Sequence, residues 1–272
     1  MFTYINPEVR KRLVARGKLV RINHAGKRIS VDEAPPEGEI AINVLGPIPL
    51  PIMLDDHQMH VQWYATVRSS ELAQVESLAR TLSEQGRQTA FAELASALAV
   101  NSVLVSGDLE NMESPLVRVH SSCLTGDVFG SQRCECGPQF VSALKKITDS
   151  EHGGMLIYMS GHEGRGIGLW AKAATYLLQD DGEDTYQANE SLGLPADSRD
   201  FSDAAALLNY FAPDKPIRLL TNNPKKVNDL KQLGIANISA EKHVVGIGDW
   251  NRRYLAAKKD WGHQFDPSDI EN

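Results

Sequence analysis

All three cysteines of the chain lie in one short window, as Cys123, Cys134 and Cys136. Three thiols this close together can supply thiolate ligands to one soft or borderline cation such as Zn²⁺. Three protein ligands leave the fourth tetrahedral position open for water, which suits a catalytic metal better than a closed structural site. The alternative is that the thiols pack as small apolar groups, and the Cys-x-Cys step alone leaves both interpretations open.

Composition describes an ordinary soluble globular protein. The chain has 272 residues, of which 42% are hydrophobic and 23% charged, enough for one large domain or two small ones. We expect a cytoplasmic protein without a membrane partner, because no apolar run could span a bilayer and the N-terminus lacks the apolar stretch of a signal peptide. An odd cysteine count argues against a disulfide framework and fits a reducing compartment.

The net charge of −7 disfavours binding to a nucleic-acid backbone, so no nucleic-acid partner is expected. A small anionic ligand is still compatible with this charge where basic side chains converge. The candidates for such a cluster lie in or beside the motifs described below, although basic side chains usually lie on the solvated surface. These candidates are Arg118, Arg133, Arg165, Arg199, Lys225 and Lys226.

We divide the chain into an N-terminal extension over 1–43, a catalytic domain over 44–265 and a disordered tail over 266–272. One short helix is possible over 7–17, and apolar periodicity predicts helix over 70–98. Beyond the cysteines, strands and helices alternate, with Ser202 expected to cap one helix and Gly234 to end another. The predicted fold is α/β (α+β), a mixed sheet with flanking helices and substantial parallel character. We expect strands over 61–67, 101–108, 116–121, 155–160, 216–222 and 235–245, and helices over 138–147, 166–180, 202–211 and 223–234.

The stretch RVHSSCLTGDVFGSQRCECGPQ, followed by HEGRGIGL, LGLPADSRDF and LLTNNPKK, resembles the GTP cyclohydrolase II family. The resemblance is dense over 101–263 and looser from 44, and several motifs in the right order make it specific. It implies hydrolysis of GTP that opens the imidazole ring and releases formate and pyrophosphate. The implied product is 2,5-diamino-6-ribosylamino-4(3H)-pyrimidinone 5′-phosphate, a riboflavin precursor. It further implies a homodimer, one Zn²⁺ per chain and Mg²⁺ with the GTP phosphates.

Carried over residue by residue, the resemblance makes Cys123, Cys134 and Cys136 the zinc ligands. One position departs from the family pattern, because Ser122 stands where the family usually has Glu, so one polar contact differs. Further positions match the nucleotide contacts of the family. They are Arg118, Val119, His120, Ser121, Ser122, Gln139, Glu163, Gly164, Arg165, Thr185, Thr221 and Lys226.

Three further residues match positions of the catalytic machinery. The family assigns proton acceptance to the counterpart of Asp197 and nucleophilic attack on the α-phosphorus to that of Arg199. Tyr176 matches a tyrosine that helps decide whether the reaction proceeds past ring opening. Because guanidinium stays protonated at neutral pH, we favour Arg199 as a stabiliser of charge on the transferring phosphate. Without the resemblance, Asp197 and Arg199 would be taken as a helix-end ion pair, and Tyr176 as a core residue.

Physical chemistry suggests roles for several of the matched residues. The carboxylate of Glu163 can accept from N1–H and the 2-amino group of guanine. A Gly-rich loop at a helix start, as in EGRGIG, and Lys226 in the first turn of a helix both suit a phosphate, although such a loop can be a plain turn. With three thiolates available, we expect His120 and His162 to be structural or to contact substrate, not to bind the metal.

Two alternatives to a GTP cyclohydrolase II remain open. One is a paralogue with the same zinc and nucleotide framework that acts in pyrimidine catabolism, which Ser122 and the unusual N-terminal region allow. The other is a non-catalytic nucleotide-binding module with a structural zinc. Asp197, Arg199 and Tyr176 weigh against the second, because a binding module has no need for all three.

Overall fold

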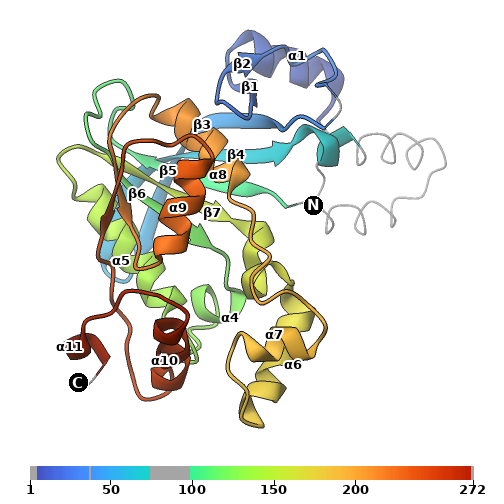
Figure 1. The fold of residues 1–272 in the computed structure, drawn as a ribbon. Coiled ribbons are helices and arrows are strands. Elements are labelled where there is room, and N and C mark those ends of the chain that lie inside the picture. The colour runs from blue at the N-terminus through green and yellow to red at the C-terminus, as the bar shows by residue number, and fades with distance from the viewer. Residues whose placement is uncertain (1–4, 37, 74–98, 271–272) are drawn as a thin grey trace.

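The computed structural model describes residues 5–36, 38–73 and 99–270. Its strands form one nine-stranded mixed sheet in the order β2-β1-β3-β4-β5-β7-β6-β8-β9 (Figure 1). The predicted mixed sheet with flanking helices is therefore confirmed. Most of the helix expected over 70–98 lies outside the described residues.

The sheet has an antiparallel half and a parallel half. The antiparallel half contains β1 (Leu19–Asn23), β2 (Arg28–Ile29), β3 (Ala41–Leu54), β4 (His57–Arg68) and β5 (Asn101–Ser106). Strand β7 (Gly154–Met159) joins the halves, since it pairs antiparallel with β5 and parallel with β6. The parallel half continues through β6 (Leu116–Ser121), β8 (Ile217–Leu220) and β9 (Ile238–Glu241).

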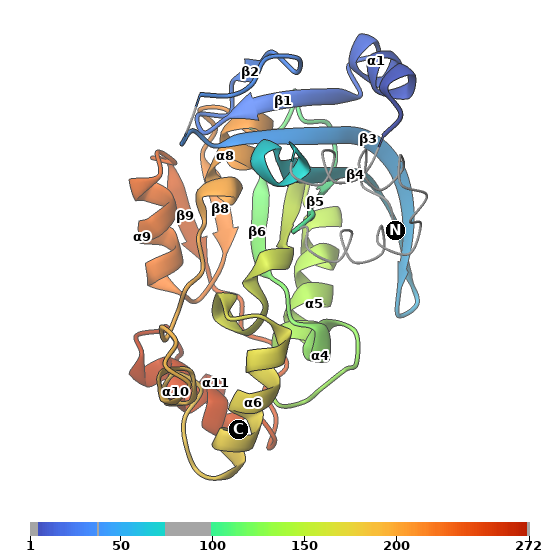
Figure 2. The same ribbon diagram turned by 90° about the vertical axis from the view of Figure 1, so that its right-hand side faces the viewer.

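Helices cover both faces of the sheet, and each face has its own core (Figure 2). In β5, for example, Val103 and Val105 pack into one core while Leu104 packs into the other, as the two-residue period of a strand requires. The first core is completed by α8 (Ser202–Phe211) and α9 (Pro224–Gln232), and the second by α5 (Cys136–Thr148). Two covered faces explain the nearly continuous apolar sequence of these strands.

The remaining described helices include α1 (Pro7–Ala15) near the antiparallel edge. The others gather beyond the carboxyl ends of the parallel strands (Figures 1 and 2). The described part of the chain contains no helix that could serve as a transmembrane span. The gathered elements are α4 (Leu124–Asp127), the 3₁₀ segment η1 (Ser160–Gly166), α6 (Leu169–Asp180), α7 (Gln187–Ser191), α10 (Arg252–Asp260) and α11 (Pro267–Ile270).

The N-terminal residues contribute more structure than the sequence predicts. Strands β1 and β2 extend the main sheet, and residue 44, where we placed a boundary, lies inside β3. The pattern of β1 hides its burial because Arg21 is among its buried residues; its guanidinium donates to Asn43 Oδ1 and to the carbonyl oxygens of Ser30 and Glu33.

Three smaller expectations have different outcomes. Gly234 follows the C-cap of α9 with φ +96°, so the predicted helix stop is confirmed. The expected cap at Ser202 is wrong, because Phe201 holds the N-cap position and the Ser202 hydroxyl donates to Asp200 instead. Residues 267–270, within the expected tail, form the short helix α11.

Candidate functional site

One pocket lies where the parallel strands end. The segments that follow β6, β7 and β8 all contribute side chains to it, among them Ser122, Glu163 and Asn222. Parallel strands bring their carboxyl ends to a single edge of a sheet, which is where α/β proteins bind ligands. All the predicted site residues line this pocket except Val119 and Asp197. The backbone oxygen of Val119 accepts from Lys226 Nζ at 2.7 Å, and Asp197 pairs with Arg199.

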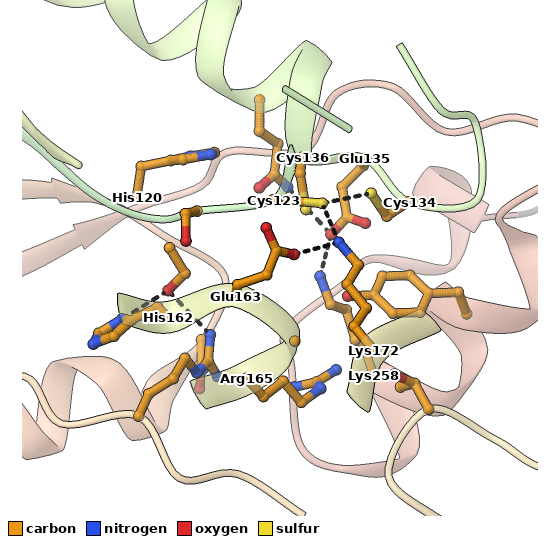
Figure 3. A pocket seen from close by; sticks show the side chains of 18 of the residues that line it. His120, Cys123, Cys134, Glu135, Cys136, His162, Glu163, Arg165, Lys172 and Lys258 are labelled. Carbon is orange, nitrogen blue, oxygen red and sulfur yellow. Dashed lines mark hydrogen bonds and ion pairs between the residues drawn. The ribbon is translucent and has the colours of Figure 1, made fainter. Parts of the chain in front are cut away.

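The three thiols form a compact cluster on two helix starts (Figure 3). Cys123 is the N-cap of α4 and Cys136 is the first residue of α5. The three sulfurs lie within 4.8 Å of one another, and those of Cys123 and Cys134 are 3.6 Å apart. Zinc–sulfur bonds of about 2.3 Å in tetrahedral geometry place sulfurs about 3.8 Å apart. The cluster therefore has the donor set and the spacing for a metal ion.

A glycine makes room for the cluster. A Cβ atom at Gly126 would lie 3.0 Å from the Cys134 sulfur and 3.1 Å from the Cys123 sulfur. These separations are tighter than ordinary van der Waals contact, so any larger residue here would push the sulfurs out of position. The packing of the thiol cluster therefore requires glycine at position 126.

The electrostatics of the cluster favour a cation. Hydrogen bonds from the Cys134 and Cys136 thiols, together with the Lys172 ammonium, lower the pKa of Cys123. The hydrogen bond with Cys123 in turn raises the pKa of Cys134 to about 12. Without a metal, one thiolate therefore opposes the ionisation of the next, whereas a divalent cation favours the thiolate form of all three ligands.

Lys172 links the thiol cluster to Glu163, a role that no sequence motif indicates. Its ammonium lies 3.1 Å from Cys123 Sγ and 2.5 Å from Glu163 Oε1 (Figure 3). The other carboxylate oxygen of Glu163 accepts from the backbone N–H of Leu124 at 2.7 Å. Both oxygens of Glu163 are thereby fixed, and each keeps a lone pair for a further donor.

The loop after Glu163 has an unusual backbone. Gly164 and Arg165 both adopt left-handed conformations, with φ +60° and +63°. A non-glycine residue in this region carries a steric cost of about 1–2 kcal/mol, and such strain often occurs at functional sites. The guanidinium of Arg165 stacks on the ring of Tyr186, 3.9 Å from its centroid, and keeps one buried nitrogen without a partner among the described residues.

The pocket collects positive charge although the chain is acidic. Arg118 donates to the Leu220 carbonyl at 2.8 Å and to Gln139 Oε1 at 2.7 Å, and burial lowers its pKa to about 10. Burial and the neighbouring charges of Arg118 and Arg199 lower the pKa of Lys226 well below its ordinary value, which means that its ammonium lacks a compensating negative charge among the described residues. Within the described ranges, no carboxylate pairs with Arg118, Arg165 or Lys226. The pocket is therefore suited to an anionic ligand.

Not all the basic candidates converge on this pocket. Lys225 forms an exposed ion pair with Asp229 on the surface of α9. Arg133 reaches the pocket from the cysteine loop, where its guanidinium lies 4.5 Å from the centroid of the Tyr176 ring. The hydroxyl of Tyr176 lies 2.9 Å from that of Thr125, so Tyr176 lines the pocket and belongs to neither core.

The two candidate histidines have partners other than the thiols. His120 Nε2 lies 3.1 Å from both carboxylate oxygens of Asp127. His162 Nε2 lies 2.9 Å from the Asp200 carbonyl oxygen and its Nδ1 lies 3.2 Å from Ser121 Oγ. Burial lowers the pKa of His162 to about 4, so this imidazole is neutral at physiological pH.

The structure also adds pocket residues that the sequence did not suggest. They come from the cysteine loop, α6, α7, the turn after β8 and the C-terminal segment, and the quoted motifs contain only Glu135, Asn222 and Asn223. They include Glu135, Lys172, Thr175, Gln179, Asn189, Asn222, Asn223, Tyr254, Lys258, His263 and Phe265.

Comparisons with known proteins show the family to which the chain belongs. The sequence profile of a family described as GTP cyclohydrolase II matches residues 75–241. The chain is 48% identical over 166 residues to a monofunctional riboflavin biosynthesis protein, RIBA 3, of Arabidopsis thaliana, covering 61% of this chain and 32% of that protein. It is 50% identical over 163 residues to the riboflavin biosynthesis protein RibBA of Nocardia farcinica, covering 60% and 39%. The chain thus spans less than half the length of these relatives.

Proposed function

The chain belongs to the GTP cyclohydrolase II family, and from this premise we propose that it hydrolyses GTP in riboflavin biosynthesis. The proposed reaction opens the imidazole ring, releases formate and pyrophosphate, and gives the diamino-ribosylamino-pyrimidinone 5′-phosphate. One observation carries the proposal: a three-thiol metal cluster and a set of cations without carboxylate partners share one pocket. A purine nucleotide triphosphate has a base and a phosphate chain that need these two environments.

We propose that Cys123, Cys134 and Cys136 hold one zinc ion. Bound there, zinc would supply Lewis-acid chemistry for hydrolysis at the purine carbon that leaves as formate. The spacing of the sulfurs and the room left by Gly126 support this assignment. The ammonium of Lys172 beside Cys123 further favours the thiolate that a metal needs.

Glu163 is the proposed guanine-binding residue. Its carboxylate lies close to the thiol cluster, held by Lys172 on one oxygen and by the Leu124 N–H on the other. A carboxylate in this position can accept from N1–H and the 2-amino group of guanine, whereas adenine has no N1–H to donate. We assign the choice of guanine over adenine to this residue.

The phosphate chain is proposed to lie against Arg118, Lys226 and Arg199, with Mg²⁺ bound to its outer oxygens. The pair Asp197–Arg199 supports an electrostatic role for the arginine. Burial opposes ionisation of Asp197, but the hydrogen bonds and charge of Arg199 lower its pKa to about 2. Asp197 in turn raises the pKa of the buried Arg199, so its guanidinium stays protonated and stabilises charge at the α-phosphate.

One observation favours a second candidate, a paralogue with the same zinc and nucleotide framework that acts on another substrate in pyrimidine catabolism. Ser122 places a hydroxyl in the pocket and donates to the Ser160 carbonyl at 2.9 Å, so this position offers no carboxylate to a substrate. For the GTP cyclohydrolase II function, the family resemblance leads us to propose a homodimer that acts in the cytoplasm.

A substrate panel separates the two candidates. The zinc-loaded protein is incubated with GTP, ATP, UTP or CTP in the presence of Mg²⁺, and formate and the absorbance of the pyrimidinone product are followed. We expect product from GTP alone. Formate release from none of the nucleotides, with the metal bound, would contradict the proposed reaction and favour the paralogue.

A further inference from the structure

The C-terminal segment 251–265 lies beyond the range that the family profile matches, which ends at residue 241. It nevertheless contributes four side chains to the pocket: Tyr254 and Lys258 from α10, and His263 and Phe265 from the turn that follows. Figure 1 shows α10 among the helices that gather beyond the carboxyl ends of the parallel strands. This segment is therefore part of the pocket wall.

The segment is fastened on two sides of the pocket. The ring of Trp261 stacks on Tyr186, with centroids 4.0 Å apart and planes 11° apart, and Tyr186 carries Arg165 on its ring. On the other side, the Gln264 N–H donates to the Asn222 carbonyl at 2.8 Å. Tyr186 and Asn222, the two residues that hold the segment, are close to the proposed nucleotide site, so the position of the segment is coupled to that of the site.

Lys258 brings a largely buried cation into the pocket. Its side chain is 12% exposed and forms an ion pair with Glu135, which is 2% exposed and lies between Cys134 and Cys136 (Figure 3). An ammonium has three donors, and this contact uses one of them. Its Nζ also lies 4.7 Å from the centroid of the Tyr254 ring, and in the described part of the chain its hydrogen-bond partner is Glu135, so its other donors can meet an anion in the pocket.

His263 completes the arrangement. Its Nδ1 is buried without a hydrogen-bond partner in the described part of the chain. Burial, together with the charges of Lys258, Arg165, Arg199 and Lys226, lowers its pKa to about 3. The ring is therefore neutral and surrounded by cations, and a neutral imidazole donates one N–H and accepts at its other nitrogen. An imidazole nitrogen without a hydrogen-bond partner, close to several cations, is suited to bind a ligand with negatively charged oxygens.

We propose that Lys258 and His263 bind the phosphate chain of the nucleotide and so close the phosphate end of the pocket. The Lys258 ammonium and a ring N–H of His263 would each donate to a phosphate oxygen. The identity of the nucleotide rests on the proposed function, but these two residues would recognise only its phosphate chain, which is a linear polyphosphate. Inorganic tripolyphosphate is therefore a sufficient probe.

The test measures the Kd of inorganic tripolyphosphate by calorimetry at fixed ionic strength, using the full chain loaded with zinc. Lys258→Met and His263→Phe are compared with the wild type. Lys259→Met is the matched control, because it removes an exposed charge from the same helix. Loss of a charge-assisted hydrogen bond should raise the Kd about tenfold or more for Lys258→Met and for His263→Phe. The control should change the Kd less than about twofold.

Thermal unfolding and zinc content accompany each variant. If Lys258→Met fails to fold because Glu135 loses its partner, the His263→Phe result decides alone. Tripolyphosphate bound by His263→Phe as tightly as by the wild type would overturn the proposal. Failure of the proposed reaction is distinguishable: a wild-type protein that binds tripolyphosphate with the predicted losses, yet releases no formate from GTP, supports this subsite and contradicts only the reaction.

Discussion

Asp197 accepts two hydrogen bonds from the guanidinium of Arg199, at 2.9 Å from Nε and 2.6 Å from Nη2. Both side chains are largely buried, with 16% and 11% exposed. This two-point contact fixes the plane of the guanidinium and leaves Nη1 for other partners, with Ser121 Oγ at 3.4 Å. A carboxylate so occupied is better suited to hold an arginine than to accept a proton.

The first prediction concerns Arg199 itself. Arg199→Ala should lower the rate of pyrophosphate release about a hundredfold or more, because removal of a charge-stabilising group at a reacting centre typically lowers the rate by this factor. Zinc content should remain at the wild-type level, since Arg199 does not contact the thiols. Arg218→Ala, which removes a guanidinium paired with Glu241 at the far end of β8, is the control. Pyrophosphate release at the wild-type rate by Arg199→Ala would remove this residue from the mechanism.

The second prediction is the acid dependence of stability due to Asp197. Its pKa in the folded protein is about 2, below the ordinary value of 3.8, so its ionised form stabilises the fold. This contribution is fully present above about pH 4 and is lost as the pH falls towards 2. The difference in free energy of unfolding between the wild type and Asp197→Asn should therefore shrink between pH 6 and pH 3. Urea denaturation at both pH values measures it, and a difference independent of pH would contradict the assignment.

The third prediction concerns the metal. Cys134→Ser should lower zinc content at least about tenfold, because the thiolate is the ligand that zinc prefers and three ligands leave none to spare. Ring opening should be lost, while tripolyphosphate binding should persist because the cations lie outside the thiol cluster. Elemental analysis of dialysed protein provides the measurement. Equal zinc in variant and wild type would refute the three-thiol site.

The fourth prediction addresses guanine selectivity. Inosine triphosphate keeps N1–H and lacks the 2-amino group, so the wild type should use it about tenfold or more less efficiently than GTP in kcat/KM. In Glu163→Gln this preference should shrink, because the amide offers one acceptor oxygen instead of two. Zinc content is measured in parallel to show that the neighbouring thiols are intact. An unchanged ratio of the two kcat/KM values would place selectivity on another residue.

The sequence predicted much of the parallel half of the fold, because strands buried on both faces are marked by apolar runs such as those of β6 and β7. It failed in the N-terminal part, where buried Arg21 breaks the pattern of β1. The motifs of the family resemblance also assigned Cys123, Glu163 and Arg199, which are far apart in the chain, to one site. They could not reveal Lys172, whose role exists only because α6 packs its ammonium against Cys123 and Glu163.

The C-terminal contribution was beyond sequence reasoning for a similar reason. Lys258 and His263 lie in an ordinary basic helix and its following turn, and nothing in their spacing indicates a partner. Their position depends on long-range contacts, above all the stack of Trp261 on Tyr186. Side chains that acquire a role through tertiary packing leave no local signature.

We propose that one pocket opens the base of GTP at the thiol cluster and cleaves its phosphate chain at the cationic end. The decisive measurement quantifies formate and pyrophosphate together, from GTP and Mg²⁺, with the zinc-loaded wild type. We expect equimolar release of both products, and loss of formate when the zinc is chelated. Release of neither product by protein that carries one zinc per chain, or formate release that survives complete removal of the metal, would contradict it.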